Sequence, residues 1–327
     1  MSNQKRSRET ITEQYTCLLQ NLCDIATSYY FLGKLKQAQQ LLNTGLQMAE
    51  EDEVCLQARG NLLFHTGILQ ARCIVYLGND ATIALTTLSQ ARTIAEVMAD
   101  EKLLASIIDW TGQALYYQAL NASVDKADFQ VALQYFHEAL ERRQQIDDGW
   151  GICESTFNIG RVYQNTGDHE QAQPYFVKTL ALAEEHNHQI LMAEVLLHLG
   201  ICALTQGDLE AARSSLALSM TMREELNVRI DLPFTYLGMG DLAQELDDMD
   251  QAALYYQKAA LLAQEMELPV PYIFSLLSIG YLHLAQKDPT KALTGFEEAR
   301  HLAQHHNVSF ALLAAVEARD AAQAKIG

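Results

Sequence analysis

The chain has few prolines and few cysteines for its length, and both shortages narrow the fold class. Only five of the 327 residues are proline, at positions 174, 233, 269, 271 and 289. Because proline interrupts helices, this scarcity predicts an almost wholly helical chain with short turns. The six cysteines are scattered without a Cys-x-x-Cys pair. We therefore expect neither a metal site nor a disulfide framework.

Positive charge is also scarce. The chain has 23 lysines and arginines against 41 aspartates and glutamates, which gives a formal net charge of −18. Its one basic cluster, Lys5, Arg6 and Arg8, lies at the extreme N-terminus. Phosphate binding needs a positive surface, so we do not expect nucleic acid as a main partner.

Long hydrophobic runs are missing. No stretch reaches the roughly 18 uninterrupted apolar residues of a membrane span, and residues 1–14 lack the apolar segment of a secretory signal. With 49% hydrophobic residues, the chain can nevertheless bury a large core. We expect a cytoplasmic globular protein without a membrane span.

One motif recurs along the chain. Glycines stand at intervals of 40 residues in the second half: Gly160, Gly200, Gly240 and Gly280. Twelve residues after each comes an alanine (Ala172, Ala212, Ala252, Ala292), and four residues later a large apolar residue (Phe176, Leu216, Tyr256, Phe296). Several coincident sites at one period indicate a repeat architecture.

The same pattern, with insertions, extends back to the N-terminal part. We expect a single domain over residues 1–327 with repeats at roughly 15–50, 58–98, 102–145, 150–187, 190–227, 230–267 and 270–307, and a capping helix over 309–325. The third unit is stretched, and we place its insertion in a polar loop at residues 119–127.

Each unit has the pattern of two antiparallel helices. Small residues at the Gly and Ala sites let the two helices approach closely, and the large residues fill the space between successive pairs. Left-handed turns are expected at Gly33, Gly78, Gly167 and Gly207, and also at Asn187, Asn227 and Asn307. Second helices are expected to start at the N-caps Asp80, Asp168, Asp208, Asp248 and Asp288.

These units resemble tetratricopeptide repeats. The resemblance rests on Gly160, Tyr163, the Gly167-Asp168 pair, Ala172 and the later aromatic Phe176. The unit is longer than the family's usual length of about 34 residues, and such long units are similar to the sensor arms of bacterial signal-transduction ATPase regulators. The resemblance implies an all-α solenoid, a right-handed superhelix of about seven helix pairs, whose first helices line a concave groove that holds a peptide or another ligand.

The inward face of each first helix can be read from its register. We place the ligand-binding groove between units three and seven, where the sites predicted to face inward are Tyr116, Phe157, Arg161, Leu197, Ile201, Asp241 and Tyr281, with Glu194, Arg72 and Asp109 beside them. The C-terminal half of this lining is apolar, and Arg72 and Arg161 are its only basic residues. A peptide, a segment of a partner protein or a hydrophobic small molecule fits such a lining. Self-association remains open.

An enzyme acting on a hydrophobic small molecule is the alternative. In that case Asp109, Glu154, Glu194 or Asp241 would act as the acid, and Tyr30, Tyr116, Tyr117 and Trp110 would line the site. No Ser-His-Asp or Cys-His arrangement and no phosphate-binding loop is recognisable, so we favour a binding protein without a cofactor. The histidine pairs, such as His186 and His188, are interpreted as helix ends rather than metal ligands.

Overall fold

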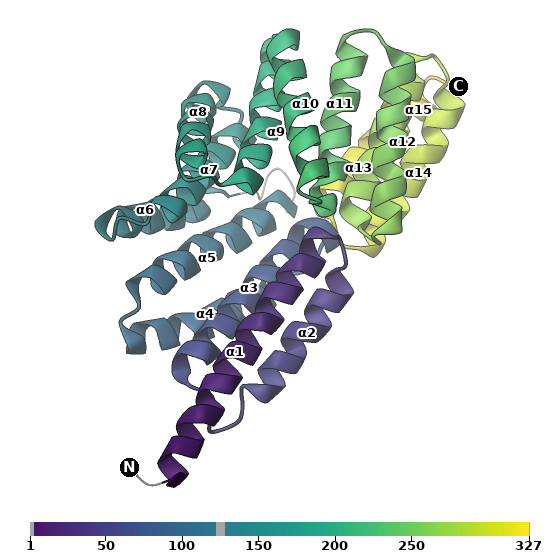
Figure 1. Ribbon diagram of the computed structural model, residues 1–327. Helices are drawn as coiled ribbons and strands as arrows, with labels where there is room; N and C mark the ends of the chain where they lie inside the picture. Colours follow the sequence, from purple (N-terminus) through teal and green to yellow (C-terminus); the bar gives the residue numbers. More distant parts are fainter. Residues whose placement is uncertain (1–2, 122–127, 327) are drawn as a thin grey trace.

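Helices account for almost all of the computed structural model, which describes residues 3–121 and 128–326. In these ranges there are fifteen α-helices, one short 3-10 helix and no strand (Figure 1). The helices form seven successive antiparallel pairs and a final single helix: α1 (Asn3–Phe31) with α2 (Leu35–Met48), α3 (Leu56–Leu77) with α4 (Thr82–Met98), α5 (Glu101–Asn121) with α6 (Gln130–Gln145), α7 (Gly149–Asn165) with α8 (His169–Glu185), α9 (Gln189–Gln206) with α10 (Leu209–Glu225), α11 (Leu232–Glu245) with α12 (Met249–Glu265), α13 (Pro269–Ala285) with α14 (Pro289–His305), and α15 (Ser309–Gln323). The 3-10 helix η2 (Arg229–Asp231) precedes α11.

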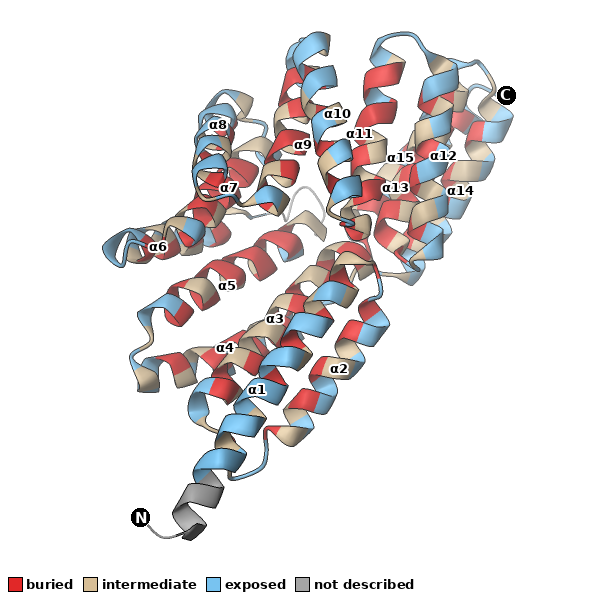
Figure 2. Ribbon diagram, in the orientation of Figure 1, coloured by how far each residue is buried: buried red, intermediate tan, exposed pale blue. Residues whose placement is uncertain are grey.

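The pairs stack into a right-handed superhelix, in which the first helix of each pair lies on the inner side. Each helix contacts the next along the chain, and first helices of successive pairs also contact each other, as α5 contacts α7. Figure 2 shows exposed residues along the outer helices such as α2 and α14, whereas most of α5 is buried. This arrangement confirms the all-α solenoid.

The predicted turn chemistry is confirmed at most positions. Positive φ angles occur at all the positions where left-handed turns were expected: Gly33, Gly78, Gly167, Gly207, Asn187, Asn227 and Asn307. Asp168, Asp208, Asp248 and Asp288 are N-caps whose side chains accept a backbone N–H. Asp80 differs from the prediction. The N-cap of α4 is Ala81, and the side chain of Asp80, one residue before it, accepts a hydrogen bond from the backbone N–H of Thr82.

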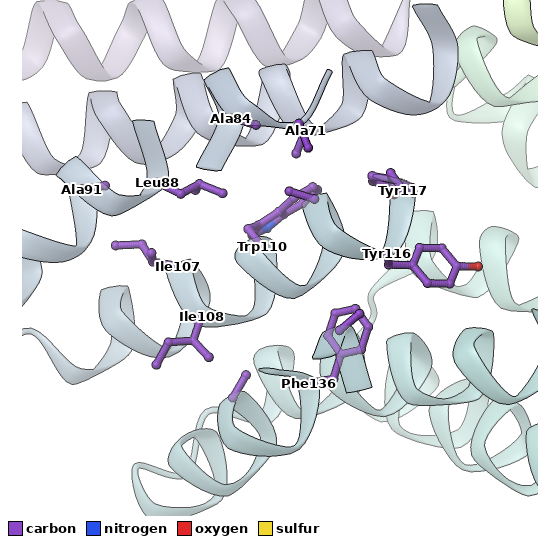
Figure 3. Packing of buried hydrophobic residues seen from close by; sticks show 14 of the residues in the cluster. Ala71, Ala84, Leu88, Ala91, Ile107, Ile108, Trp110, Tyr116, Tyr117 and Phe136 are labelled. Atoms are coloured by element: carbon purple, nitrogen blue, oxygen red, sulfur yellow. The ribbon is translucent and has the colours of Figure 1, made fainter. Parts of the chain in front are cut away.

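The repeating small residues are sites where two helices touch. A methyl group on Gly200 would lie 2.6 Å from Cγ of the buried Leu216, and one on Gly160 would lie 2.8 Å from the ring of Phe176. Helices also pack closely against each other at the centre of the N-terminal half. There Ala71 and Leu88 on one side of α5, and Phe136 on the other, pack against it (Figure 3).

The insertion in the third unit is only partly described. The loop was expected to begin at Ala119, but α5 continues through Asn121, whose side-chain amide donates a 3.0 Å hydrogen bond to the carbonyl of Ile74. This bond extends the helix beyond the expected boundary. Residues 122–127, which hold the rest of the expected loop, lie outside the described residues.

One described helix is long and apolar enough to cross a membrane by length and composition, namely α9 (Gln189–Gln206). It packs between α8 and α10, and its side chains Leu191, Val195 and Leu197 are buried there. Burial inside the solenoid accounts for the apolar composition of α9.

The superhelix closes on itself. Helix α13 contacts α3, α15 contacts α5, and η2 contacts α1. At this junction Gly33 faces the side chain of Met266, Gly78 lies against the backbone of His306, and Lys36 forms an ion pair with Glu267. The first and last units therefore meet across the inner face, where the ends of an open solenoid would lie apart.

We predict that Gly200→Leu destabilises the protein by about 1–3 kcal/mol, because the added side chain overpacks the contact with Leu216. Urea denaturation followed by circular dichroism measures the change. Gly295→Ala is the control, since a methyl group there comes no closer than 3.4 Å to its neighbours. An unchanged free energy of unfolding for Gly200→Leu would show that Gly200 is not a helix contact.

Candidate ligand-binding cavity

The first helices of the first five units and η2 converge on a central cavity of about 150 Å³. Its lining is mainly aromatic and charged, and each of these helices contributes at least two side chains: Tyr30, Phe31, Arg72, Tyr76, Trp110, Gln113, Tyr117, Glu154, Phe157, Asn158, Arg161, Ile190, Leu191 and Glu194, joined by His188 and Asp231. We call it the central cavity.

Aromatic rings hold the two cationic side chains of the central cavity. The guanidinium carbon of Arg72 lies 4.1 Å from the ring centroid of Tyr30 and 5.0 Å from that of Trp110. The guanidinium carbon of Arg161 lies 4.5 Å from the ring centroid of Tyr116 and 5.2 Å from the ring centroid of Tyr117. Such cation–π contacts favour a desolvated guanidinium and leave the N–H groups in its plane available to other partners.

Three acidic side chains face the same space. Glu154 accepts a 3.0 Å hydrogen bond from Arg143, and Asp231 accepts one from Tyr76, whose hydroxyl lies 3.3 Å from that of Tyr30. Glu194 has neither a hydrogen bond nor an ion pair among the described residues. Burial raises the pKa of both glutamates; Arg143 partly offsets this for Glu154, as Arg161 does for Glu194.

A buried ionic network supports the wall of the cavity. Arg143 on α6, 1% exposed, donates to Asp109 on α5 at 3.1 Å and to Ser155 on α7 at 2.7 Å. The completely buried Asp109 also accepts from Gln113 at 3.1 Å and Asn158 at 2.9 Å, both of which line the cavity. The network links three helices and orients the two amide side chains that face the cavity.

A second, apolar cavity of about 360 Å³ shares α3, α5 and α7 with the central cavity and is also lined by α11, α13 and α15. Its aromatic lining comprises Phe129, Phe234, Phe274 and Phe310, and the ring centroids of Phe274 and Phe310 are 5.2 Å apart. Its lining residues follow those of the central cavity by about one helical turn: Leu120 follows Tyr117, Asn165 follows Arg161, and Phe234 follows Asp231. We call it the phenylalanine cavity.

Four of the residues predicted for the groove line the central cavity: Arg72, Phe157, Arg161 and Glu194. Tyr116 and Asp109 lie behind its wall, the first stacked on Arg161 and the second paired with Arg143. The structure thus brings these six together from units two to five.

The other predicted residues lie elsewhere. Leu197 and Ile201 belong to a hydrophobic cluster with Leu216 on α10 and Met239 on α11. Asp241 is exposed and accepts a 2.6 Å hydrogen bond from Tyr256 in its own unit. Tyr281 is 45% exposed and packs edge-on against Phe296. None of these four side chains lines either cavity.

The sequence analysis did not place Asp231, Asn158 and His188 in the site. Asp231 reaches the cavity through closure of the superhelix, for which the local pattern has no signal. Asn158 lies two residues before the repeated glycine Gly160, and its side chain donates a hydrogen bond to Asp109, so a polar residue on this buried face was a usable signal. His188 is the N-cap of α9, as a helix-end role predicts, and burial lowers its pKa to about 4.

No group of three or more His, Cys, Asp or Glu side chains with the arrangement of a metal site occurs in the described part of the chain.

Comparison with known proteins identifies the type of repeat. Sequence models described as Tetratricopeptide repeat match residues 111–185, 151–225 and 235–265. Response regulator aspartate phosphatase J of Bacillus subtilis is 34% identical over 58 residues, which make up 18% of this chain and 16% of that protein. The aligned segment is therefore a small part of this relative.

Solved structures share the fold at low sequence identity. A Rap protein crystallised with Competence and Sporulation Factor is 15% identical, with a TM-score of 0.66 over 86% of this chain and 73% of that one. A signal-transduction ATPase with a tetratricopeptide-repeat sensor from Pyrococcus horikoshii is 16% identical, with a TM-score of 0.55 over 98% of this chain and 53% of that one. Aspartyl phosphate phosphatase F from Bacillus subtilis is 12% identical, with a TM-score of 0.53 over 94% of both chains.

We predict that Asp109→Leu destabilises the protein by about 3–5 kcal/mol, because it leaves the buried Arg143 charge without its main partner. Glu154→Gln is the comparison: it removes the second carboxylate, which is 37% exposed, and should cost much less. Urea denaturation of both variants measures the difference. Equal, small losses would show that the network contributes little to stability.

Proposed function

Since the chain belongs to the tetratricopeptide-repeat family, we propose that it is a binding module that holds a peptide, or an extended segment of a partner protein, inside its closed superhelix. The two adjoining cavities are the proposed site. The enclosed ligand would contact the first helices of several repeats at once.

The observation that carries this proposal is the change of lining along the inner face. The central cavity offers charged, amide and aromatic groups, and the phenylalanine cavity, about one helical turn away, offers almost only apolar surface. A peptide in extended conformation places polar backbone groups and an apolar side chain at such a separation. A uniformly apolar small molecule would offer no hydrogen bond to the unpartnered Nε of Arg161 or to the carboxylate of Glu194.

A similar structure supports a binding role. The Rap protein that shares this fold was crystallised in complex with Competence and Sporulation Factor. A chain with this fold can thus hold a bound partner.

The cysteines support a reducing compartment, for which we propose the cytoplasm. All six are free, and four of them are buried. Free thiols in this number are typical of proteins that stay in a reducing environment.

The test is a peptide selection against the full chain, followed by a variant that fills the cavity. We predict that Ile190→Trp, which places a large ring in the central cavity, weakens binding of the selected peptides at least tenfold by isothermal titration calorimetry. Val177→Trp on the outer face of α8, where Val177 is 55% exposed, is the matched control and should leave affinity unchanged. Peptides that bind Ile190→Trp as well as the wild type would contradict the proposed site.

A further inference from the structure

An apolar seam runs along one side of α1. Six side chains follow one another there in alternating steps of four and three residues: Ile11, Tyr15, Leu18, Leu22, Ile25 and Tyr29. Three of them, Ile11, Leu18 and Ile25, are 39 to 46% exposed, and the other three are partly buried. Alternating steps of this kind are the spacing by which one helix packs along another. We call these six residues the α1 seam.

The repeat pattern shows what such a seam is for. Ile25 directly precedes the small residue of its unit, as Ile159 and Leu199 do in the fourth and fifth units. Ile159 on α7 is completely buried in one cluster with Phe136 of the preceding helix α6. Leu199 on α9 packs against the cluster that contains Phe176 of the preceding helix α8. In later units this position is therefore covered by the second helix of the preceding pair.

At α1 the corresponding place has no such neighbour. Every later first helix contacts the second helix before it, as α5 contacts α4 and α7 contacts α6. Helix α1 is the first helix of the described ranges, and its main contacts are with α2, α3 and η2. At the other end, the capping helix α15 carries Glu317 and Asp320 among its exposed residues, as the end of a solenoid requires. The first helix instead presents the α1 seam.

The α1 seam is complementary to a second copy of itself in the antiparallel direction. When two seams are laid antiparallel with their centres superposed, three kinds of pair form between the copies: Ile11 with Tyr29, Tyr15 with Ile25, and Leu18 with Leu22. Each tyrosine then meets an isoleucine and each leucine meets a leucine, so the layers are of similar volume. A parallel pair would stack tyrosine on tyrosine and isoleucine on isoleucine. Antiparallel packing is also how consecutive helices of this solenoid meet.

The border of the seam carries no charge, although the chain has a net charge of −18. The exposed residues beside it are Gln14, Asn21 and Ser28. In the antiparallel pair the two copies of Asn21 lie next to the two-fold axis, where an amide can donate a hydrogen bond to its own copy and accept one from it. Two copies can therefore approach at this face without placing like charges in contact.

We propose that the α1 seam is the interface of a homodimer, in which the second copy's α1 lies antiparallel on α1. It takes the place that the preceding second helix takes in later units. No seam residue lines either cavity, so this interface is separate from the proposed peptide site. Residues 11–29 span about 28 Å of helix, and a single pair of such helices covers less surface than a permanent dimer does. The dimer is therefore reversible.

Sedimentation velocity of the full chain over a range of concentrations measures the association. We expect the mass to rise from 36.6 kDa toward twice that value, and to rise further with salt, which screens the repulsion between two acidic copies. Leu18→Glu and Ile25→Glu each place like charges in the interface and should raise the dissociation constant about tenfold or more. Both side chains are exposed in the single chain, so circular dichroism should show unchanged helicity. Leu313→Glu on α15, where Leu313 is 42% exposed, is the matched control.

A disulfide tests the direction of the two helices. In a Cys17→Ser background, which removes the exposed thiol of α1, Asn21→Cys should form a crosslinked dimer with oxidised glutathione. Positions 21 of the two copies meet in the antiparallel pair, whereas in a parallel pair they lie on opposite borders of the seam. Gln20→Cys is the control, because the exposed Gln20 lies on the opposite side of the helix and should not crosslink.

Three results would overturn the inference. The first is a mass that stays at 36.6 kDa up to about 100 μM protein, since a specific interface of this kind should associate below that concentration. The second is a dimer that Leu18→Glu and Ile25→Glu leave intact, which would place the interface elsewhere; loss of the dimer in Leu313→Glu would place it at the capping helix. The third is a dimer that both seam variants dissolve but that Asn21→Cys does not crosslink, which would contradict the antiparallel pairing.

Discussion

Contact between the first and last units of the superhelix is the constraint on which the site depends. An open solenoid with these helix pairs would present a concave groove to solvent. Here the turn after α1 meets Met266, the end of α3 meets the loop before α15, and Tyr76 donates a hydrogen bond to Asp231 across 155 residues of sequence. Closure divides the inner face into two cavities and brings Asp231 to the central cavity, which is otherwise built from the first five units.

Enclosure changes the energetics of the charged side chains inside. On an exposed concave face, Arg72, Arg161 and Glu194 would be solvated at little cost. Inside a closed superhelix each unpaired charge loses part of its hydration, and aromatic rings compensate only for the guanidiniums. A ligand with complementary groups would therefore gain more free energy here than on an open surface, because the protein's polar groups are already desolvated and held in place.

The sequence predicts the repeat architecture well because local rules determine it. Periodic glycines and alanines set the helix contacts, and Gly33, Gly167 and Asn187 mark turns that only a few residue types can make. The same register correctly indicates that Phe157 and Arg161 face inward. The register does not predict how the solenoid curves, because curvature accumulates from small rotations between successive helix pairs. Glu194 and Ile201 lie two turns apart on α9, and the register assigns both to the inner face. Only the curvature decides that Glu194 reaches the central cavity, whereas Ile201 packs between neighbouring helices.

The most direct measurement of closure is a double-mutant cycle between Tyr76 and Asp231. The free energies of unfolding of Tyr76→Phe, Asp231→Asn and the double variant give a coupling energy that depends only on contact between the two side chains. If the superhelix is closed, these residues from the second and sixth units should be coupled by about 0.5–3 kcal/mol. Additive effects of the two substitutions would show that the ends do not meet, and would contradict the enclosed site.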